Sequence, residues 1–433
     1  RVLIPPSWQP MWVTPSPAWT PGCGVDCGVT NAAIARWREI YIGSPPTGGI
    51  SMFTSIRAGM HHRLRRVVGL LTALLAAAHI LVGSAAAHVE YVTPGGEPQN
   101  VVAFLTDALT TPFIIAILLG GFLAIVVGLV AYLSLRPFPA DIAAFRAVMT
   151  DYKDLLPWLF RLSMGMPMIG AGFGGYFFSP AVELPYPTVL RLFGISVGFL
   201  LLFGLATRVV AAGTLLLYLA VLPSEPGLLL AFEYVPGLLA IALLGGGRPS
   251  ADALIARMAD DDRTVYSDID PFYRRVAVPF AERIEPYTAM VPTLLRGGIG
   301  VAFIYLGITQ KLLRPGQALA VVGKYDLTAV VPVAPELWVI GAGLTEALVG
   351  VMFLLGAFTR GFSLVAFGLF VTTLFGLPDD PVVAHISLFG LVSALLITGA
   401  GPYSVDGWLK SKFGAAAEMI GRDDDRRDPP TAE

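Results

Sequence analysis

The sequence is poor in charge and in the side chains that hold metals or form disulfides. Only 14% of its 433 residues are Asp, Glu, Lys or Arg, whereas soluble domains average roughly 25%. Two cysteines cannot build a disulfide scaffold or a four-ligand zinc site, and five histidines argue against a haem or copper centre. A net charge of −2 provides no basic field for nucleic acid. We therefore expect no metal site and no nucleic-acid partner.

Sequence patterns of self-contained catalysts are also missing. The chain has no CxxC pair, no P-loop, no Rossmann glycine pattern and no recognisable Ser/His/Asp set. Because no redox cofactor site can be recognised, a redox activity of this chain would need a partner, and we expect no covalently bound cofactor.

Apolar residues dominate instead. They make up 55% of the chain, and the mean hydropathy is +0.70. Since a helix needs roughly 20 apolar residues to span a bilayer, we expect an all-α polytopic membrane protein with about ten transmembrane helices in a lipid bilayer. The apolar runs are residues 67–87, 113–135, 158–178, 189–206, 209–222, 228–244, 294–310, 337–358, 361–377 and 382–400.

The N-terminal part is predicted in two pieces. Residues 1–60 are rich in Pro, Trp and Gly, and we expect either a disordered extension or sequence read from upstream of the true start. The Cys23/Cys27 pair within them is only a weak metal signal. Residues 61–156 are predicted as a leader with two spans. The first span, 67–87, follows a basic flank and ends in small residues, so it is either a cleaved signal peptide or a retained span.

Two later blocks of the chain resemble each other. Leu201–Arg208 and Phe353–Arg360 both end in Gly-x-x-Thr-Arg, while 247–252 and 401–406 both read Gly-x-x-Ser-x-Asp. The similarity predicts two parallel four-helix bundle repeats around a two-fold axis normal to the membrane. The predicted bundles are 157–254 and 292–409, with a cytoplasmic linker 255–291 between them and a charged cytoplasmic tail 410–433.

Basic residues indicate the orientation. If the basic flank 61–66 lies inside, the linker arginines, Arg360 and the tail lysines lie inside as well. Few basic residues remain outside, as the positive-inside rule requires. We expect a multi-pass protein of the plasma membrane with its C-terminus in the cytoplasm.

The second block contains a set of short motifs at Arg296, Gly307–Lys311, Glu346–Gly350, Gly356–Arg360 and Gly401–Asp406. In these motifs, and most closely in the last, it resembles the DoxX-like integral membrane proteins. The first block resembles them less closely, because it keeps Arg161 but has Gly194 where the second has Glu346.

The resemblance implies a four-helix membrane unit and a redox context. Some relatives are subunits of quinone-linked sulfur oxidation systems such as thiosulfate:quinone oxidoreductase, and others accompany redox or thiol-handling enzymes. This implies the membrane subunit of a quinone- or thiol/sulfur-linked system with a partner oxidoreductase and a non-covalently bound quinone. Two alternatives stay open, a small-solute transporter or permease and a membrane scaffold without activity of its own.

Glu346 is the candidate catalytic residue, because a carboxylate near the middle of a span is costly and normally faces a cavity or a partner. The alternative is a structural carboxylate paired with a base. Lys311, His385 and Glu233 are expected near the outer ends of their spans. That placement would let them gather with Glu346 in one outward-facing pocket.

Lys311, His385 and Arg296 are the substrate-binding candidates, and each has a plainer alternative. Lys311 would extend its ammonium group to the membrane surface, and His385 would be a satisfied interfacial histidine. Arg296, like Arg161, would anchor its helix to lipid phosphates or to carboxylates of the bundle. Caps of the surface helix after each bundle are predicted at Ser250, Asp252, Ser404 and Asp406.

Overall fold

The computed structural model describes residues 99–412, except 136, 183, 271–272 and 380–381. The Cys23/Cys27 pair, the basic flank 61–66, the run 67–87 and the tail from residue 413 onward lie outside the described residues. Within the described part the chain is all-α, and its β structure is limited to an isolated bridge between Phe177 and Ser179. The all-α part of the predicted fold class is confirmed for the described residues.

Four helical stretches among the described residues are long and apolar enough to cross a membrane, so the chain is a multi-span membrane protein. They are α5 (Pro112–Leu135), the stretch Tyr273–Leu312, α17 (Pro335–Leu355) and α18 (Thr359–Gly376). The other predicted runs in this part correspond to α7 (Leu156–Gly174), α8 (Pro187–Phe203), α9 (Thr207–Val221), α10 (Tyr234–Leu244) and α19 (Val382–Thr398).

The predicted run 228–244 is not one helix, which corrects the sequence analysis. A 3-10 segment, η2 (Pro226–Ala231), precedes α10, which begins only at Tyr234. The hydroxyl of Tyr218 accounts for part of the break, because it donates to the carbonyl oxygens of Leu228 at 2.6 Å and Ala231 at 3.3 Å. Pro236 lacks an N–H, so it fits only in the first turn of a helix that starts near Tyr234.

The second part of the bundle contains helices that the sequence analysis did not predict. α14 (Val291–Tyr305) continues into a π-helical segment, η5 (Leu306–Leu312), and α15 (Pro315–Lys324) and α16 (Leu327–Val330) follow. Lys324 Nζ lies 2.7 Å from Asp379 Oδ2, and the Tyr325 hydroxyl donates to the same oxygen at 3.0 Å. These hydrogen bonds hold the pKa of Asp379 below its usual range and tie α15 to the loop after α18.

The segment before the first bundle is also more structured than expected. Between the two predicted spans of the leader lies a further helix, α4 (Val101–Thr110), which the sequence pattern did not predict. The Asn100 side chain caps this helix by accepting a hydrogen bond from the Ala103 N–H at 3.1 Å. Phe104 and Ala108, one helical turn apart, are buried in an apolar cluster with residues of α15 and α17. α5 and α6 (Pro139–Asp151) follow.

The predicted linker contains short helices, as expected, and internal ion pairs. Arg263 pairs with Asp261 at 2.7 Å, and Arg274 pairs with Asp262 at 2.6 Å. The helices are α11 (Ala251–Asp260), α12 (Val265–Ile269), the π segment η3 (Tyr273–Ala277), α13 (Val278–Ile284) and the 3-10 segment η4 (Glu285–Met290).

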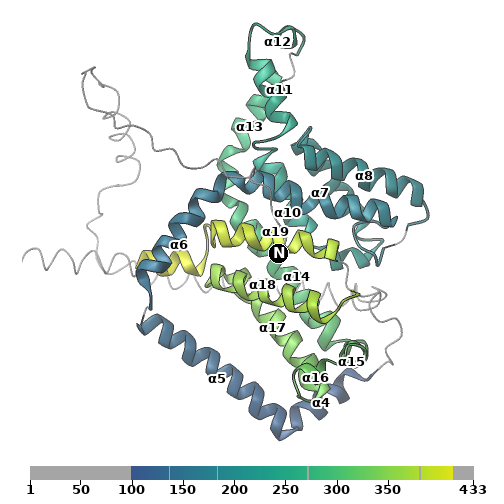
Figure 1. Ribbon diagram of the computed structural model, residues 1–433, viewed down its shortest axis with the longest axis vertical. Coiled ribbons are helices and arrows are strands. Elements are labelled where there is room, and N and C mark those ends of the chain that lie inside the picture. Colours follow the sequence, from purple (N-terminus) through teal and green to yellow (C-terminus); the bar gives the residue numbers. More distant parts are fainter. Residues whose placement is uncertain (1–98, 136, 183, 271–272, 380–381, 413–433) are drawn as a thin grey trace, which may run out of the picture. The chain divides into compact units, whose positions relative to one another are not determined.

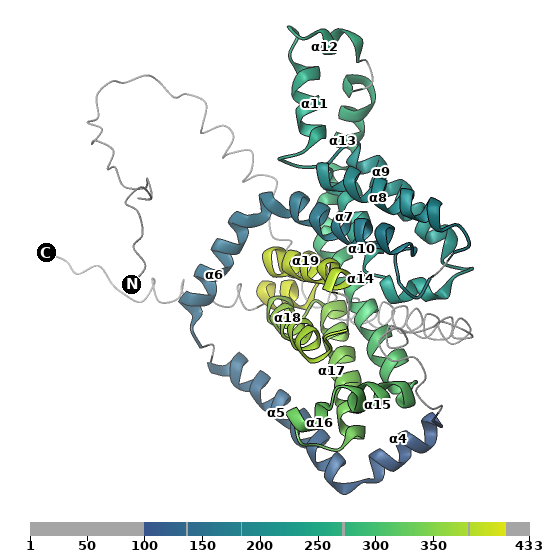
Figure 2. The ribbon, with the colours of Figure 1, turned by 45° about the vertical axis from the view of Figure 1, so that its right-hand side comes forward.

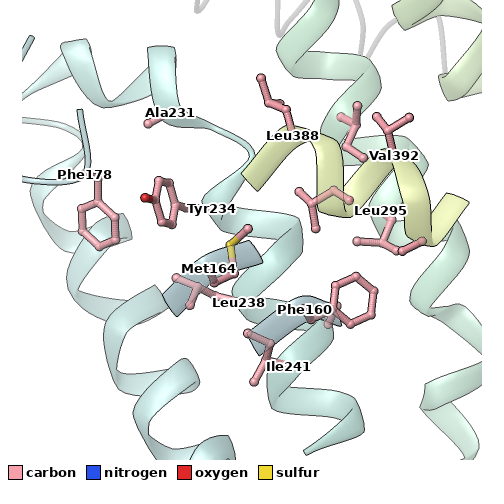
Figure 3. Close-up of a cluster of buried hydrophobic side chains, with 14 of the residues drawn as sticks. Phe160, Met164, Phe178, Ala231, Tyr234, Leu238, Ile241, Leu295, Leu388 and Val392 are labelled. Carbon is pink, nitrogen blue, oxygen red and sulfur yellow. The ribbon is translucent and has the colours of Figure 1, made fainter. Parts of the chain in front are cut away.

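Helices α7–α10, which we call the first group, and helices α14–α19 with η5, the second group, make matching contacts (Figures 1 and 2). α7 packs on α8 as α14 packs on α17, and α9 packs on α10 as α18 packs on α19. The groups meet where α7 contacts α19 and where α10 contacts α14. The first helix of each group therefore packs on the last helix of the other. Apolar side chains such as Met164, Leu238 and Leu295 fill this junction (Figure 3).

Glycines allow α7 and α8 of the first group, and α14 and α17 of the second group, to cross closely. A Cβ atom at Gly300 would lie 2.7 Å from the Gly350 carbonyl oxygen, and one at Gly165 would lie 2.9 Å from the Gly198 carbonyl oxygen. Small residues at such crossings let helix backbones approach each other in lipid. The α7–α8 and α14–α17 pairs therefore use the same packing device.

A buried arginine in the first helix of each group binds backbone carbonyls from other segments of that group. Arg161 and Arg296 are 3% and 4% exposed, so the expected lipid or carboxylate anchoring is wrong. Both guanidinium groups donate to backbone carbonyls instead. The acceptors are Leu201, Leu202, Gly246 and Pro249 for Arg161, and Phe353, Leu354, Ala400, Pro402 and Tyr403 for Arg296.

The predicted caps are half right. Ser250 and Ser404 accept hydrogen bonds from the backbone N–H three residues later, at 3.0 and 3.1 Å, and so cap the surface helix of their own segment. Asp252 and Asp406 cap a different helix from the one expected. They accept hydrogen bonds from the first N–H groups of α9 and α18, which lie at the preceding inner turns.

The close crossing of α14 and α17 gives a test. Gly300→Ala forces the two backbones apart, so we expect the free energy of unfolding to fall by about 1–3 kcal/mol. Gly297→Ala is the matched control, since a Cβ atom at Gly297 meets nothing within 4 Å. Thermal unfolding in detergent measures both. Equal stability of the two variants would contradict the close packing.

Candidate functional site

The sharpest sequence candidate is paired. Glu346 lies near the middle of α17 and Lys311 lies in η5, and Lys311 Nζ is 2.7 Å from Glu346 Oε2. The Glu346 side chain is 21% exposed and the Lys311 side chain is 25% exposed. One interpretation expected Lys311 to extend to the membrane surface, but its ammonium group binds Glu346 instead. The alternative in which Glu346 pairs with a base describes the contact that is present.

Local backbone geometry places this pair. Gly307 opens the π-helical segment against α17, and a Cβ atom there would lie 2.6 Å from the Gly343 carbonyl oxygen and 3.0 Å from Glu346 Cβ. The wider π turn then carries Lys311 over Glu346. Single π segments inside α-helices are frequent at functional sites, which makes this crossing more than a packing contact.

The first group has no equivalent of the pair. Gly194 stands where the repeat would place a glutamate, and a Cβ atom there would lie 2.7 Å from Gly172 Cα. The backbones of α7 and α8 are too close at this point for any side chain. The carboxylate at Glu346 is therefore a feature of the second group.

Gln310 is a polar residue of this region that the sequence analysis missed. Its side chain is 1% exposed, its Nε2 group donates to Thr309 Oγ1 at 3.0 Å, and its Oε1 atom has no hydrogen-bond partner among the described residues. The signal in the sequence was an amide directly before Lys311 inside an apolar run. Gln310 leaves an unused acceptor beside the ion pair.

The Arg296 guanidinium group uses its N–H groups in hydrogen bonds to backbone carbonyl oxygens. Its five N–H groups match five hydrogen bonds to carbonyl oxygens at 2.5–3.3 Å. A substrate would have to displace one of these carbonyls to reach the guanidinium group. The geometry accordingly favours a structural role over the substrate-binding role that the sequence suggested.

Glu233 and His385 do not join Glu346 in one pocket, which corrects that expectation. Glu233 is 7% exposed, accepts a hydrogen bond from Ser387 Oγ at 3.1 Å, and lines a cavity whose walls include neither Glu346, Lys311 nor His385. His385 is 5% exposed, and its ring lies edge-on to Phe370 with centroids 6.2 Å apart. The predicted single site is therefore two places, the ion pair and the Glu233 cavity.

Among the residues that the structure describes, no three His, Cys, Asp or Glu side chains come together in a way that would hold a metal ion.

The fold and the paired charges describe an α-helical membrane protein with a polar site inside one helical group. Residues 291–385 match the family model described as DoxX, so the chain contains a DoxX family domain at these residues. The match runs from α14 to the first turn of α19 and includes Arg296, Lys311, Glu346 and His385. Searches of curated proteins and of solved structures gave no match.

A double-mutant cycle tests the ion pair. Lys311→Met leaves the Glu346 carboxylate without its partner, so we expect the free energy of unfolding to fall by about 1–3 kcal/mol, less than for a fully buried pair. The double variant Lys311→Met/Glu346→Leu removes both charges and should recover part of that loss.

Reversible denaturation in mixed micelles measures all variants. Lys324→Met, which breaks the exposed pair with Asp379, is the control and should cost no more than about 1 kcal/mol. Additive effects of the two substitutions would mean that Lys311 and Glu346 do not interact.

Proposed function

We propose that this chain is the membrane subunit of a quinone- or thiol/sulfur-linked redox system and that it works with a partner oxidoreductase. The observation that carries the proposal is the Lys311–Glu346 pair, held across a π-helical segment within the DoxX domain. Charges are expensive inside a membrane and usually mark a substrate or proton pathway. An ion pair inside a protein is weak evidence for a stabilising role, so helix packing alone does not explain why charges occupy this crossing.

The proposed chemistry is proton exchange with a non-covalently bound quinone. Reduction of a quinone to a quinol consumes two electrons and two protons. The electrons come from a reduced sulfur or thiol compound oxidised by the partner. The protons pass through Glu346 one at a time, and Lys311 stabilises the carboxylate between transfers. After each transfer a proton from the solvent reprotonates Glu346.

We also propose the full architecture of about ten spans, with two parallel DoxX-like repeats and a cytoplasmic C-terminus. Three observations support the repeats. The buried arginines Arg161 and Arg296 close equivalent inner corners, Asp252 and Asp406 cap equivalent helices, and the contacts between the groups are mutually equivalent.

Glu346→Gln tests the redox function in native membranes or in a purified complex with the partner. It keeps the shape and one hydrogen-bond acceptor but cannot exchange a proton at neutral pH. We expect quinone-dependent turnover to fall by about 100-fold or more, as for loss of a general acid or base.

Glu336→Gln, in the first turn of the same helix, is the matched control and should keep full turnover. Thermal unfolding shows whether the variant proteins stay folded. Unchanged turnover of a folded Glu346→Gln protein would rule out proton transfer at this residue.

Transport of a small solute is the second candidate function. It is favoured by the equivalent contacts between the two groups, since many transporters place their site between two internal repeats. Purified protein in liposomes should then carry solute without any electron donor, and Glu346→Gln should reduce the flux. Flux that is equal in protein-free liposomes would exclude this function.

A further inference from the structure

A small cavity lies at the junction of the two helical groups. Its volume is about 30 Å³, and its walls come from α7, the loop after α7, η2, α10, η5 and α19. Pro167, Leu306 and Leu388 are among its apolar lining residues, whereas Tyr176, Ser179 and Glu233 bring polar groups to it. No candidate residue of the redox site lines it.

The carboxylate of Glu233 is the charged group of this cavity. The side chain is 7% exposed and accepts one side-chain hydrogen bond, from Ser387 Oγ at 3.1 Å. Among the described residues, none forms an ion pair with it. An isolated carboxylate in an apolar interior is strongly unfavourable. Its charge must therefore be compensated by a bound cation or by a proton.

The size of the cavity restricts the occupant. A water molecule needs a cavity of about 10–15 Å³. A cavity of about 30 Å³ therefore holds one or two occupants of the size of water. Sugars, amino acids and quinone rings are too large. A divalent cation is a poor match, because Ca²⁺ takes 6–8 oxygen ligands and Mg²⁺ keeps an octahedral shell of waters.

The lining groups suit a small monovalent cation. Glu233 supplies one negative charge, and the hydroxyl oxygens of the lining residues Ser179, Tyr176 and Tyr234 can serve as neutral ligands. Phe178 and Tyr234 (Figure 3) also line the cavity, and their ring centroids lie 5.0 Å apart. Aromatic faces attract cations that have lost part of their water.

We infer that the Glu233 cavity is a binding site for a small monovalent cation, an alkali ion or ammonium, which bridges the two helical groups. Residues of α7 and α10 on one side and of η5 and α19 on the other enclose the occupant. A ligand that binds only the folded state stabilises that state. Binding should therefore raise the unfolding temperature of the whole bundle. The inference is independent of the redox proposal.

The test uses the purified full chain in detergent, with choline chloride as the background salt because choline is too large for the cavity. Sodium, potassium and ammonium chloride are added at constant ionic strength. Thermal unfolding is followed by intrinsic fluorescence, and binding of radioactive sodium is measured directly. We expect one of these ions to raise the unfolding temperature saturably. Comparison of the three salts distinguishes the alkali ions from ammonium.

Variants assign the effect to the cavity. Glu233→Gln should abolish the saturable shift, and Ser387→Ala should weaken binding by about threefold to tenfold because the Glu233 carboxylate loses the hydroxyl that holds it in place. Glu225→Gln removes a carboxylate outside the cavity and should bind like the natural sequence. If Glu233→Gln does not fold, Ser387→Ala and direct sodium binding still decide.

Absence of a saturable shift with all three ions, or an equal shift in Glu233→Gln, would overturn the inference. In that case a proton neutralises Glu233 and the cavity holds only water. Neither readout needs a partner enzyme or an electron donor, so this outcome would leave the redox proposal standing.

Discussion

Both helical groups depend on a buried arginine that satisfies carbonyl groups at helix ends. A helix leaves its last four carbonyls without intrahelical partners, and inside a bilayer such groups have no water to bind. Arg161 and Arg296 collect these carbonyls from two chain segments at once. The neighbouring aspartates, Asp252 and Asp406, then bind the free N–H groups that begin the next helix. One cation and one anion thereby fix each inner turn.

The same scaffold carries different interiors in the two groups. In the first group, glycines of α7 and α8 face each other at the crossing, and no side chain fits at Gly194. In the second group the π-helical turn after Gly307 makes room for Lys311 and Glu346. The charges therefore appear where the backbone has been locally widened. This arrangement is consistent with one group that supports the fold and one that carries chemistry.

Hydropathy and short motifs predicted much of the fold. The predicted spans 113–135, 337–358 and 361–377 correspond to α5, α17 and α18 to within a few residues. They were predictable because the length of an uninterrupted apolar run can be counted in the sequence. The break before α10 was missed, since it depends on a tertiary hydrogen bond from Tyr218. α4 and α15 were missed because each is short and becomes buried only against the other parts of the bundle.

The candidate site was predicted residue by residue but not as an arrangement. Glu346 and Lys311 were both named, yet their contact joins residues 35 positions apart through a π turn that hydropathy does not reveal. The arginines were misread for a related reason. A positive charge at the end of an apolar run predicts contact with lipid phosphates, and only the folded turn shows that carbonyl groups have taken their place.

α5 stands apart from this network of specific contacts. Among its 24 residues only Ile114 is buried, and a Cβ atom added at Gly120, Gly121 or Gly128 would meet nothing within 4 Å. Its contacts with the apolar cluster and with Phe358 lie towards its two ends, at Ile114, Leu118 and Tyr132. In the middle of the helix, selection can therefore act on length and hydrophobicity but scarcely on the order of the residues. Over evolutionary time the middle of α5 should drift freely among apolar residues, while the buried arginines and crossing glycines stay fixed.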